Sequence, residues 1–170
     1  SSGKFYGPSP LRTGLEQSRN LMTVRIAQAV GMSRVGEYAE RFGVFENMPE
    51  HLSYALGAGE TTLWHLVAAY GMFVNGGKRV EPTVIDRVQD RHGETLYSHD
   101  PRVCRGCEVA RFTDIRTPIL FDRRSQIMNP DTAYDMVSML EGVVSDGTAS
   151  STVGGLGFPV AGKTGTTNDA

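Results

Sequence analysis

The chain has 170 residues, of which 39% are hydrophobic and 21% are charged, and this composition is typical of a single globular domain. A net charge of −2 provides no electrostatic attraction to nucleic acid or to an anionic membrane surface. No stretch approaches the roughly 18 consecutive apolar residues of a membrane span, and residues 1–8 lack the apolar core of a signal peptide. Because the sequence does not begin with Met and stops inside a motif, we expect it to be a piece of a longer protein.

The first helical pattern along the chain is interrupted. Apolar residues recur at helical spacing over residues 11–30, but three polar residues, Ser18, Arg19 and Asn20, stand together inside it. Ser and Asn bond to nearby backbone and prefer caps and turns. We therefore predict a helix that ends at this point and a second helix from about Asn20 to Gly31.

The clearest helical pattern covers residues 61–75, with Gly76-Gly77 as its stop signal. Its apolar face consists of Leu63, Leu66, Val67, Tyr70, Phe73 and Val74. The other predicted elements are a short helix over 33–42, a β-hairpin turning at 91–93, an irregular stretch over 99–127, a helix from Asn129-Pro130 to about Ser145, and a strand over 158–166. Because helices, a hairpin, a helix and a strand follow one another without βαβ repeats, we predict an α+β fold.

The two cysteines form one C-x-x-C pair, Cys104 and Cys107. A zinc site usually needs a second such pair or added histidines, and the four histidines show no ligand spacing. We therefore predict no metal site. Outside the cytosol the pair would be able to close a small disulfide loop, and a reduced pair without a role is the alternative.

The segment Gly157 to Thr164 matches the phosphate-binding signature G-x-x-x-x-G-K-[ST]. That loop requires a buried strand before it and a helix that starts at the Lys-Thr pair. Here residues 145–157 have the composition of turns, and Pro159 inside the loop has no amide proton to donate. The match is therefore accidental, and we predict that no nucleotide binds.

The same residues suit a different ligand if they lie on an edge strand. Lys163 supplies a cation and Thr164 a hydroxyl group, while Gly165 has no side chain and lets a ligand approach closely. A strand of this kind offers a free backbone edge as well. These features suit a peptide with a carboxylate, bound by β-augmentation.

Two short motifs and the sequence stretches around them resemble those of a known family. Ser18-Arg19-Asn20 resembles the S-x-N motif, and Lys163-Thr164-Gly165 the K-T-G motif, of penicillin-binding proteins and serine β-lactamases. The stretches SGKFYGPSPLRTGLEQSRNLMTVRIA, ALGAGETTLWHLVAAYGMFVNGG and VAGKTGTTND resemble the transpeptidase domain of class A penicillin-binding proteins of the 1A type. The resemblance covers nearly the whole chain, apart from the stretch near 98–128. It implies a β-lactamase/transpeptidase-like α+β fold, with an antiparallel sheet flanked by helices, that is incomplete in residues 1–170.

The resemblance also implies roles for five residues. Ser18 would relay a proton to the departing amine, and Asn20 would bond a substrate amide. Lys163 would hold positive charge near Ser18 and the substrate carboxylate. Thr164 and Thr166 would donate hydroxyl groups to that carboxylate, and the Thr166 amide would donate to the oxyanion.

The function implied by the resemblance is that of a serine D,D-transpeptidase. A serine in an S-x-x-K motif attacks the penultimate D-Ala carbonyl of a peptidoglycan stem peptide, and an amine of a second stem captures the acyl group. β-Lactams acylate the same serine. The implied partners are stem peptides and β-lactams, without cofactor or nucleic acid. The parent protein would also carry a glycosyltransferase domain and lie at the periplasmic face of the bacterial inner membrane, with its anchor outside this chain.

The nucleophile motif is the departure from the family pattern. Ser1-Ser2-Gly3-Lys4 fits S-x-x-K in letters, but the attacking serine should open a helix, and Gly7 and Pro8 follow too closely. We therefore expect the nucleophile, its general base and the strands after K-T-G to be missing. The piece by itself is then predicted to be inactive and incompletely packed. The alternatives are a D,D-carboxypeptidase or β-lactamase of the same fold, or a binding module without catalysis.

Overall fold

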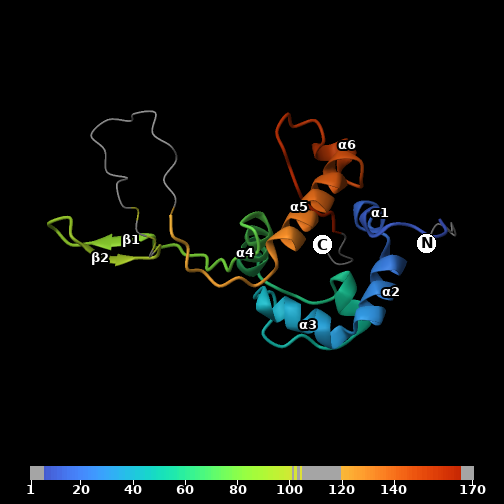
Figure 1. Ribbon diagram of the computed structural model, residues 1–170, viewed down its shortest axis with the longest axis horizontal. Coiled ribbons are helices and arrows are strands. Elements are labelled where there is room, and N and C mark those ends of the chain that lie inside the picture. The colour runs from blue at the N-terminus through green and yellow to red at the C-terminus, as the bar shows by residue number, and fades with distance from the viewer. Residues whose placement is uncertain (1–5, 101, 103, 105–119, 166–170) are drawn as a thin grey trace.

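The computed structural model describes residues 6–100, 102, 104 and 120–165. A body of helices lies at one side, and a two-stranded hairpin extends away from it (Figure 1). Over the residues described, no helix combines the length and the apolar character needed to cross a bilayer. The elements are α1 (Leu11–Glu16), α2 (Asn20–Val30), α3 (Met32–Arg41), the 3-10 helix η1 (Leu52–Leu56), α4 (Leu63–Val74), β1 (Arg87–Gln89), β2 (Thr95–Ser98), α5 (Pro130–Ser145) and α6 (Ser150–Val153).

The predicted helices are confirmed, including the break between α1 and α2. The short helices η1 and α6 are not among the predictions, because four or five residues are too few to show a periodic pattern. Together with the small antiparallel sheet, these helices form the incomplete α+β fold that the sequence indicates.

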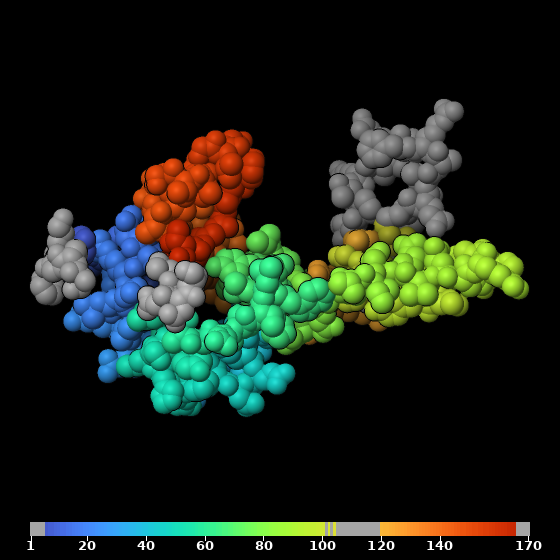
Figure 2. All heavy atoms as spheres, turned by 180° about the vertical axis from the view of Figure 1, so that it is seen from behind, coloured from blue at the N-terminus to red at the C-terminus, as the bar shows by residue number. Residues whose placement is uncertain are grey.

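The hairpin is built around a tight turn. β1 and β2 pair antiparallel, with Val88 opposite Tyr97. The Asp90 carboxylate accepts hydrogen bonds from the backbone N–H groups of His92 and Glu94, at 2.8 and 2.9 Å, and Gly93 has a φ of +87°, which favours glycine. Both strands are exposed along their whole length, and Figure 2 shows them standing out from the rest of the molecule.

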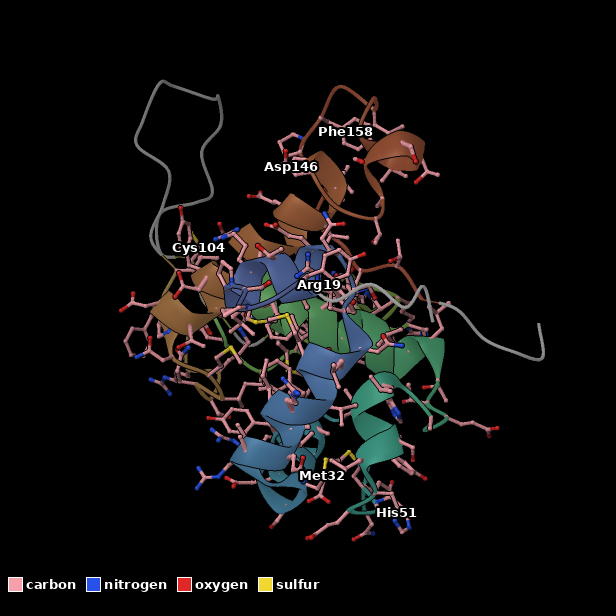
Figure 3. The ribbon with its side chains drawn as sticks, turned by 90° about the vertical axis from the view of Figure 1, so that its right-hand side faces the viewer. Arg19, Met32, His51, Cys104, Asp146 and Phe158 are labelled. Atoms are coloured by element: carbon pink, nitrogen blue, oxygen red, sulfur yellow. The ribbon has the colours of Figure 1, made fainter. Side chains whose placement is uncertain are left out.

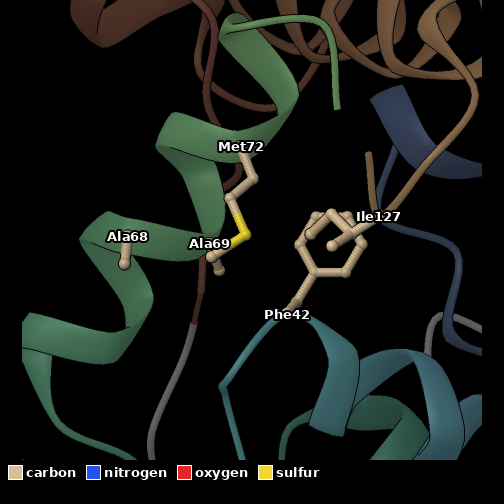
Figure 4. Packing of buried hydrophobic residues seen from close by; sticks show 5 residues of the cluster. All are labelled: Phe42, Ala68, Ala69, Met72 and Ile127. Atoms are coloured by element: carbon tan, nitrogen blue, oxygen red, sulfur yellow. The ribbon is translucent and has the colours of Figure 1, made fainter. Parts of the chain in front are cut away.

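The main core joins the end of α3, the inner face of α4 and the segment before α5. Figure 4 shows its buried residues, which are Phe42, Ala68, Ala69, Met72 and Ile127. Among the described residues, Met72 and Val143 are the large side chains that are fully buried. The core formed by the described residues is therefore small.

The apolar face predicted for α4 is not the face that is buried. Leu63 and Val74 are 76% and 75% exposed, whereas Ala68, Ala69 and Met72 face the core. Two alanines let α4 approach its neighbours closely. Of the larger residues, Phe73 packs on the edge of the core beside Phe42, whereas Leu63 and Val74 stay largely exposed. Periodicity identified the helix correctly, but burial depends on what packs against it.

The strand predicted over residues 158–166 is wrong for the part of it that is described, 158–165, where no strand forms. This segment lies against α5 instead. The Gly162 N–H donates to the Leu140 carbonyl at 3.2 Å, and Val160 packs on a cluster formed by Val143, Val144 and Ala149. β-Forming residues need a neighbouring strand to complete a ladder, and none of the described strands lies beside this segment.

The N-terminus of α5 provides a test of local stability. The Asn129 side chain accepts a hydrogen bond from the Asp131 N–H at 2.8 Å, and Pro130 follows it at the first helical position. We expect Asn129→Ala to lower the free energy of unfolding by about 1 kcal/mol, because the amide loses its partner. Urea unfolding of the full-length protein measures this loss. Asn129→Asp keeps the acceptor and should be nearly neutral, and an equal loss in both variants would contradict the capping role.

The cysteine pair falls at the edge of the described residues. Cys104 is disulfide-bonded, whereas Cys107 lies outside the described residues. No group of three His, Cys, Asp or Glu side chains within the described ranges is placed to hold a metal ion.

Candidate active site

The junction between α1 and α2 places Ser18 in an unusual backbone conformation. The Arg19 N–H donates to the Gly14 carbonyl at 2.9 Å and the Ser18 N–H to the Leu15 carbonyl at 3.1 Å. This pair of bonds is the Schellman motif that often ends a helix, and it requires a left-handed residue, usually glycine. Ser18 occupies that position with a φ of +50°. A serine held in this strained region suggests a functional constraint on its side chain.

This strain predicts that Ser18→Gly does not destabilise the protein. A left-handed non-glycine residue costs about 1–2 kcal/mol, while glycine adds about 0.5–1 kcal/mol of chain entropy in the unfolded state. We expect the variant to be as stable as the wild type or more stable, by up to about 1 kcal/mol. Thermal unfolding beside Ser18→Ala, which keeps the strain, provides the comparison. A clear loss of stability in Ser18→Gly alone would show that the serine side chain stabilises the fold.

The Lys163 ammonium group meets the Ser18 hydroxyl group. Lys163 Nζ donates to Ser18 Oγ at 2.8 Å and to the Thr164 carbonyl at 2.9 Å, and it lies 3.4 Å from Thr164 Oγ1. The structure thus brings together two motifs that are 145 residues apart in the chain. A cation and a hydroxyl group at this distance are able to exchange a proton.

The surroundings of Lys163 disfavour its charge. Its side chain borders an apolar hollow of about 400 Å³ between α3, α4 and α5, whose lining includes Phe42, Tyr70 and Leu140. Burial lowers the pKa of Lys163 below its ordinary value of 10.5, because the charged form loses hydration. A neutral fraction is therefore present at a lower pH than for a free lysine.

This shift has a measurable pH dependence. Between the lowered pKa of the folded state and the ordinary 10.5 of the unfolded state, the unfolded chain binds more protons at Lys163. The contribution of Lys163 to the free energy of unfolding therefore rises with pH between these two pKa values. NMR titration of the labelled lysine side chains in the full-length protein should give a pKa below 10.5 for the resonance that Lys163→Met removes. A value at or above 10.5 would contradict the burial.

Hydrogen bonds connect helix α1 to α5, and they fix the position of the turn that contains Ser18. Arg12 donates to the Ser138 carbonyl and hydroxyl group at 3.0 and 3.1 Å, and Gln17 Nε2 donates to the Asp146 carbonyl at 3.2 Å. A Cβ atom at Gly147 would lie 2.4 Å from the carbonyl oxygen of Glu16. Glycine at that position therefore permits the end of α1 to touch the loop after α5.

One residue of this loop, Thr148, was missed by the sequence reasoning. Its N–H donates to the Glu16 carbonyl at 3.1 Å, and its Oγ1 lies 2.6 Å from Thr164 Oγ1, where either hydroxyl group can donate. The signal in the sequence was one of two threonines in the Gly/Ser-rich stretch after the helix over 130–145. Such loops contain many threonines, so only the fold identifies this one.

The remaining predicted residues are placed as follows. Asn20 is the first residue of α2 and is exposed, without a side-chain hydrogen bond to the residues described. Gly165 is exposed next to Thr164. Thr166 and the segment Ser1 to Lys4 lie outside the described residues. Residues 157–165 are not helical, so this described segment lacks the helix that a P-loop starts at its Lys-Thr pair.

The site lies in the body of helices, at the end of the molecule opposite the hairpin (Figure 1). Figure 3 shows Arg19, the neighbour of Ser18, between the end marked by Asp146 and Phe158 and the opposite end marked by Met32 and His51. The Arg19 guanidinium lies 4.1 Å from the centre of the Tyr6 ring and donates to Ser9 Oγ at 2.8 Å. Residues before α1 are thereby held against the S-x-N turn.

Comparisons with known proteins give a consistent result. The family model described as penicillin binding protein transpeptidase domain matches residues 2–170. The chain is 44% identical over 171 residues to Penicillin-binding protein 1A of Rickettsia bellii, covering 99% of this chain and 21% of that protein. A crystal structure of Penicillin-Binding Protein 1A from Haemophilus influenzae matches with a TM-score of 0.78 at 27% identity, over 97% of this chain and 27% of that one. The D,D-transpeptidase domain of a peptidoglycan glycosyltransferase from Eggerthella lenta has the same fold, with a TM-score of 0.70 at 22% identity, over 98% of this chain and 44% of that one.

Proposed function

Because this chain belongs to the penicillin-binding protein transpeptidase domain family, we propose that it is the S-x-N to K-T-G portion of a serine D,D-transpeptidase. The chain spans about a fifth of the length of the curated relatives it matches. The proposed reaction cross-links peptidoglycan stem peptides through an acyl-serine intermediate, and β-lactams acylate the same serine.

The contact between Lys163 and Ser18 is the observation that carries this proposal. Acyl transfer needs a group that moves a proton between the attacking serine and the departing amine. The Ser18 hydroxyl group is able both to donate and to accept, and the Lys163 ammonium group 2.8 Å away supplies the proton and the positive charge. The lowered pKa of Lys163 makes its proton easier to donate than that of a free lysine.

The neighbouring residues of both motifs have proposed roles in binding. Asn20 is exposed at the start of α2, where its amide is free to bond a substrate amide. The hydroxyl groups of Thr164 and Thr166 receive the substrate carboxylate, and Gly165 leaves room for the peptide backbone. The Thr166 amide contributes to the oxyanion hole.

The proposal assigns the remaining machinery to other parts of the protein. The nucleophile and its lysine lie in an S-x-x-K segment outside these residues, and the 170-residue piece alone is inactive. The parent protein also carries a glycosyltransferase domain and works at the periplasmic face of the inner membrane.

A labelling experiment tests this function. Fluorescent penicillin is added to the full-length protein and to the 170-residue piece, and both are run on a denaturing gel. We expect a denaturation-resistant label on the full-length protein only. Label on the short piece would mean that Ser1 is the nucleophile after all, and no label on either would favour a binding module without catalysis.

A second readout separates the related enzymes. The full-length protein is incubated with a stem-peptide donor and an amine acceptor, and the products are resolved by mass spectrometry. Transfer to the amine indicates a transpeptidase. Release of D-Ala with water as the only acceptor would indicate a carboxypeptidase, and rapid turnover of penicillin would indicate a β-lactamase.

A further inference from the structure

Thr148 lies where the two motif segments meet, and neither motif contains it. Its backbone N–H donates to the Glu16 carbonyl, two residues before Ser18. Its side-chain oxygen lies 2.6 Å from Thr164 Oγ1, next to Lys163. One residue therefore touches the S-x-N side through its backbone and the K-T-G side through its hydroxyl group.

The position of Thr148 is held from both sides. The following residue, Ala149, is 7% exposed, and its N–H donates to the Val143 carbonyl at 3.0 Å. The preceding residue, Gly147, has no room for a side chain because the Glu16 carbonyl and the backbone of Val143 lie against it. The Thr148 side chain therefore projects from a backbone that cannot shift without moving α1 or α5.

The direction of the bond between the two hydroxyl groups matters for ligand binding. Each threonine hydroxyl carries one proton and two acceptor lone pairs. If Thr164 donates to Thr148, its proton is not available to a ligand. If Thr148 donates to Thr164, the Thr164 proton is free to donate to a carboxylate, and the chain of two hydrogen bonds polarises and strengthens the second one.

We propose that Thr148 is a positioning residue for carboxylate recognition, which donates to Thr164 Oγ1 and thereby turns the Thr164 proton toward the carboxylate of the stem peptide or β-lactam. The inference rests on the proposed function, in which Thr164 receives that carboxylate. It adds a residue of the loop between α5 and α6 to the site. Thr148 itself touches Thr164 and not the ligand.

The test compares two acylating agents in the full-length protein. Benzylpenicillin carries the carboxylate, and its methyl ester does not. The measured quantity is the ratio of the two second-order acylation rate constants, acid over ester, by competition with fluorescent penicillin. An unfolded fraction lowers both rate constants equally, so this ratio reports carboxylate recognition even in a variant that folds poorly.

We expect Thr148→Val to lower this ratio about threefold to tenfold, as for the loss of one net hydrogen bond. Thr148→Ser keeps the hydroxyl group and should restore the ratio. The matched control is Thr152→Val. Among the described residues, the Thr152 hydroxyl group bonds the Ala149 carbonyl alone, at 3.0 Å, and its loss should leave the ratio unchanged. In a Thr164→Val background, Thr148→Val should have no further effect.

Three outcomes would overturn the inference. Wild-type rate constants for both acid and ester in Thr148→Val would remove the role of Thr148 and leave the proposed function standing. Equal losses for acid and ester would assign Thr148 a purely structural role. Absence of label on the wild-type protein would overturn the proposed function and this inference together.

Discussion

Replacing Lys163 by methionine is expected to lower the rate of penicillin acylation of the full-length protein by about 10²- to 10⁴-fold, the range for loss of a proton-transfer group. Methionine keeps the apolar stem that borders the hollow between α3, α4 and α5. It removes the ammonium group that lies 2.8 Å from Ser18 Oγ. Stopped-flow or gel-based labelling with fluorescent penicillin measures the rate.

The stability of this variant should not fall along with its acylation rate. Burial disfavours the charged form of Lys163, so its removal should not reduce the melting temperature. Lys78→Met is the matched control. Lys78 Nζ pairs with the Asp122 carboxylate at a distance of 3.1 Å, and this ion pair does not involve the motif residues. That ion pair is partly exposed and is worth little. Wild-type labelling in Lys163→Met, or an equal loss in Lys78→Met, would contradict the role assigned to Lys163.

Replacing Gly147 by alanine is expected to lower the free energy of unfolding by about 1–3 kcal/mol, the usual cost of overpacking. The added Cβ atom would lie 2.4 Å from the Glu16 carbonyl oxygen and 2.8 Å from two backbone atoms of Val143. Backbone on both sides cannot give way without separating α1 from α5. Chemical denaturation of the full-length protein measures the loss.

The same substitution should also slow acylation. Displacing the end of α1 moves the Ser18 turn relative to Lys163, and a misplacement of about 1 Å costs on the order of 10²-fold in rate. Gly155→Ala is the matched control, since no atom of the described residues lies within 4 Å of a Cβ atom there. If Gly147→Ala and Gly155→Ala were equally stable and equally active, the close contact of α1 with the loop after α5 would have no energetic importance.

The helices illustrate what was predictable and what was not. The break at residues 18–20 was predicted because polar side chains compete locally with the helix, and this competition needs no tertiary partner. The left-handed conformation of Ser18 was not predictable in the same way. Glycine is the usual residue there, and a serine accepts the strain only when surrounding contacts enforce it.

The segment before Lys163 shows the opposite case. It was predicted as part of a strand over 158–166, but in the structure it packs on α5 through Val160 and the Gly162 N–H. Strand formation depends on a neighbour with free backbone groups. Likewise, the pattern in α4 identified the helix, but Ala68, Ala69 and Met72 form its buried face instead of the larger apolar residues.

By itself, the sequence determined the positions of the longer helices, the hairpin and the two family motifs. Helix caps, helix breakers and short sequence motifs each depend on only a few neighbouring residues. The roles carried over to Ser18, Asn20, Lys163, Thr164, Gly165 and Thr166 stay predictions. The family resemblance implied that Lys163 lies near Ser18, and the tertiary structure gives the 2.8 Å contact between the ammonium and hydroxyl groups across 145 residues. Only the tertiary structure shows that Thr148 contacts both Glu16 and Thr164. Such contacts follow from the packing of α1 on α5, which brings distant segments together and which no local pattern encodes.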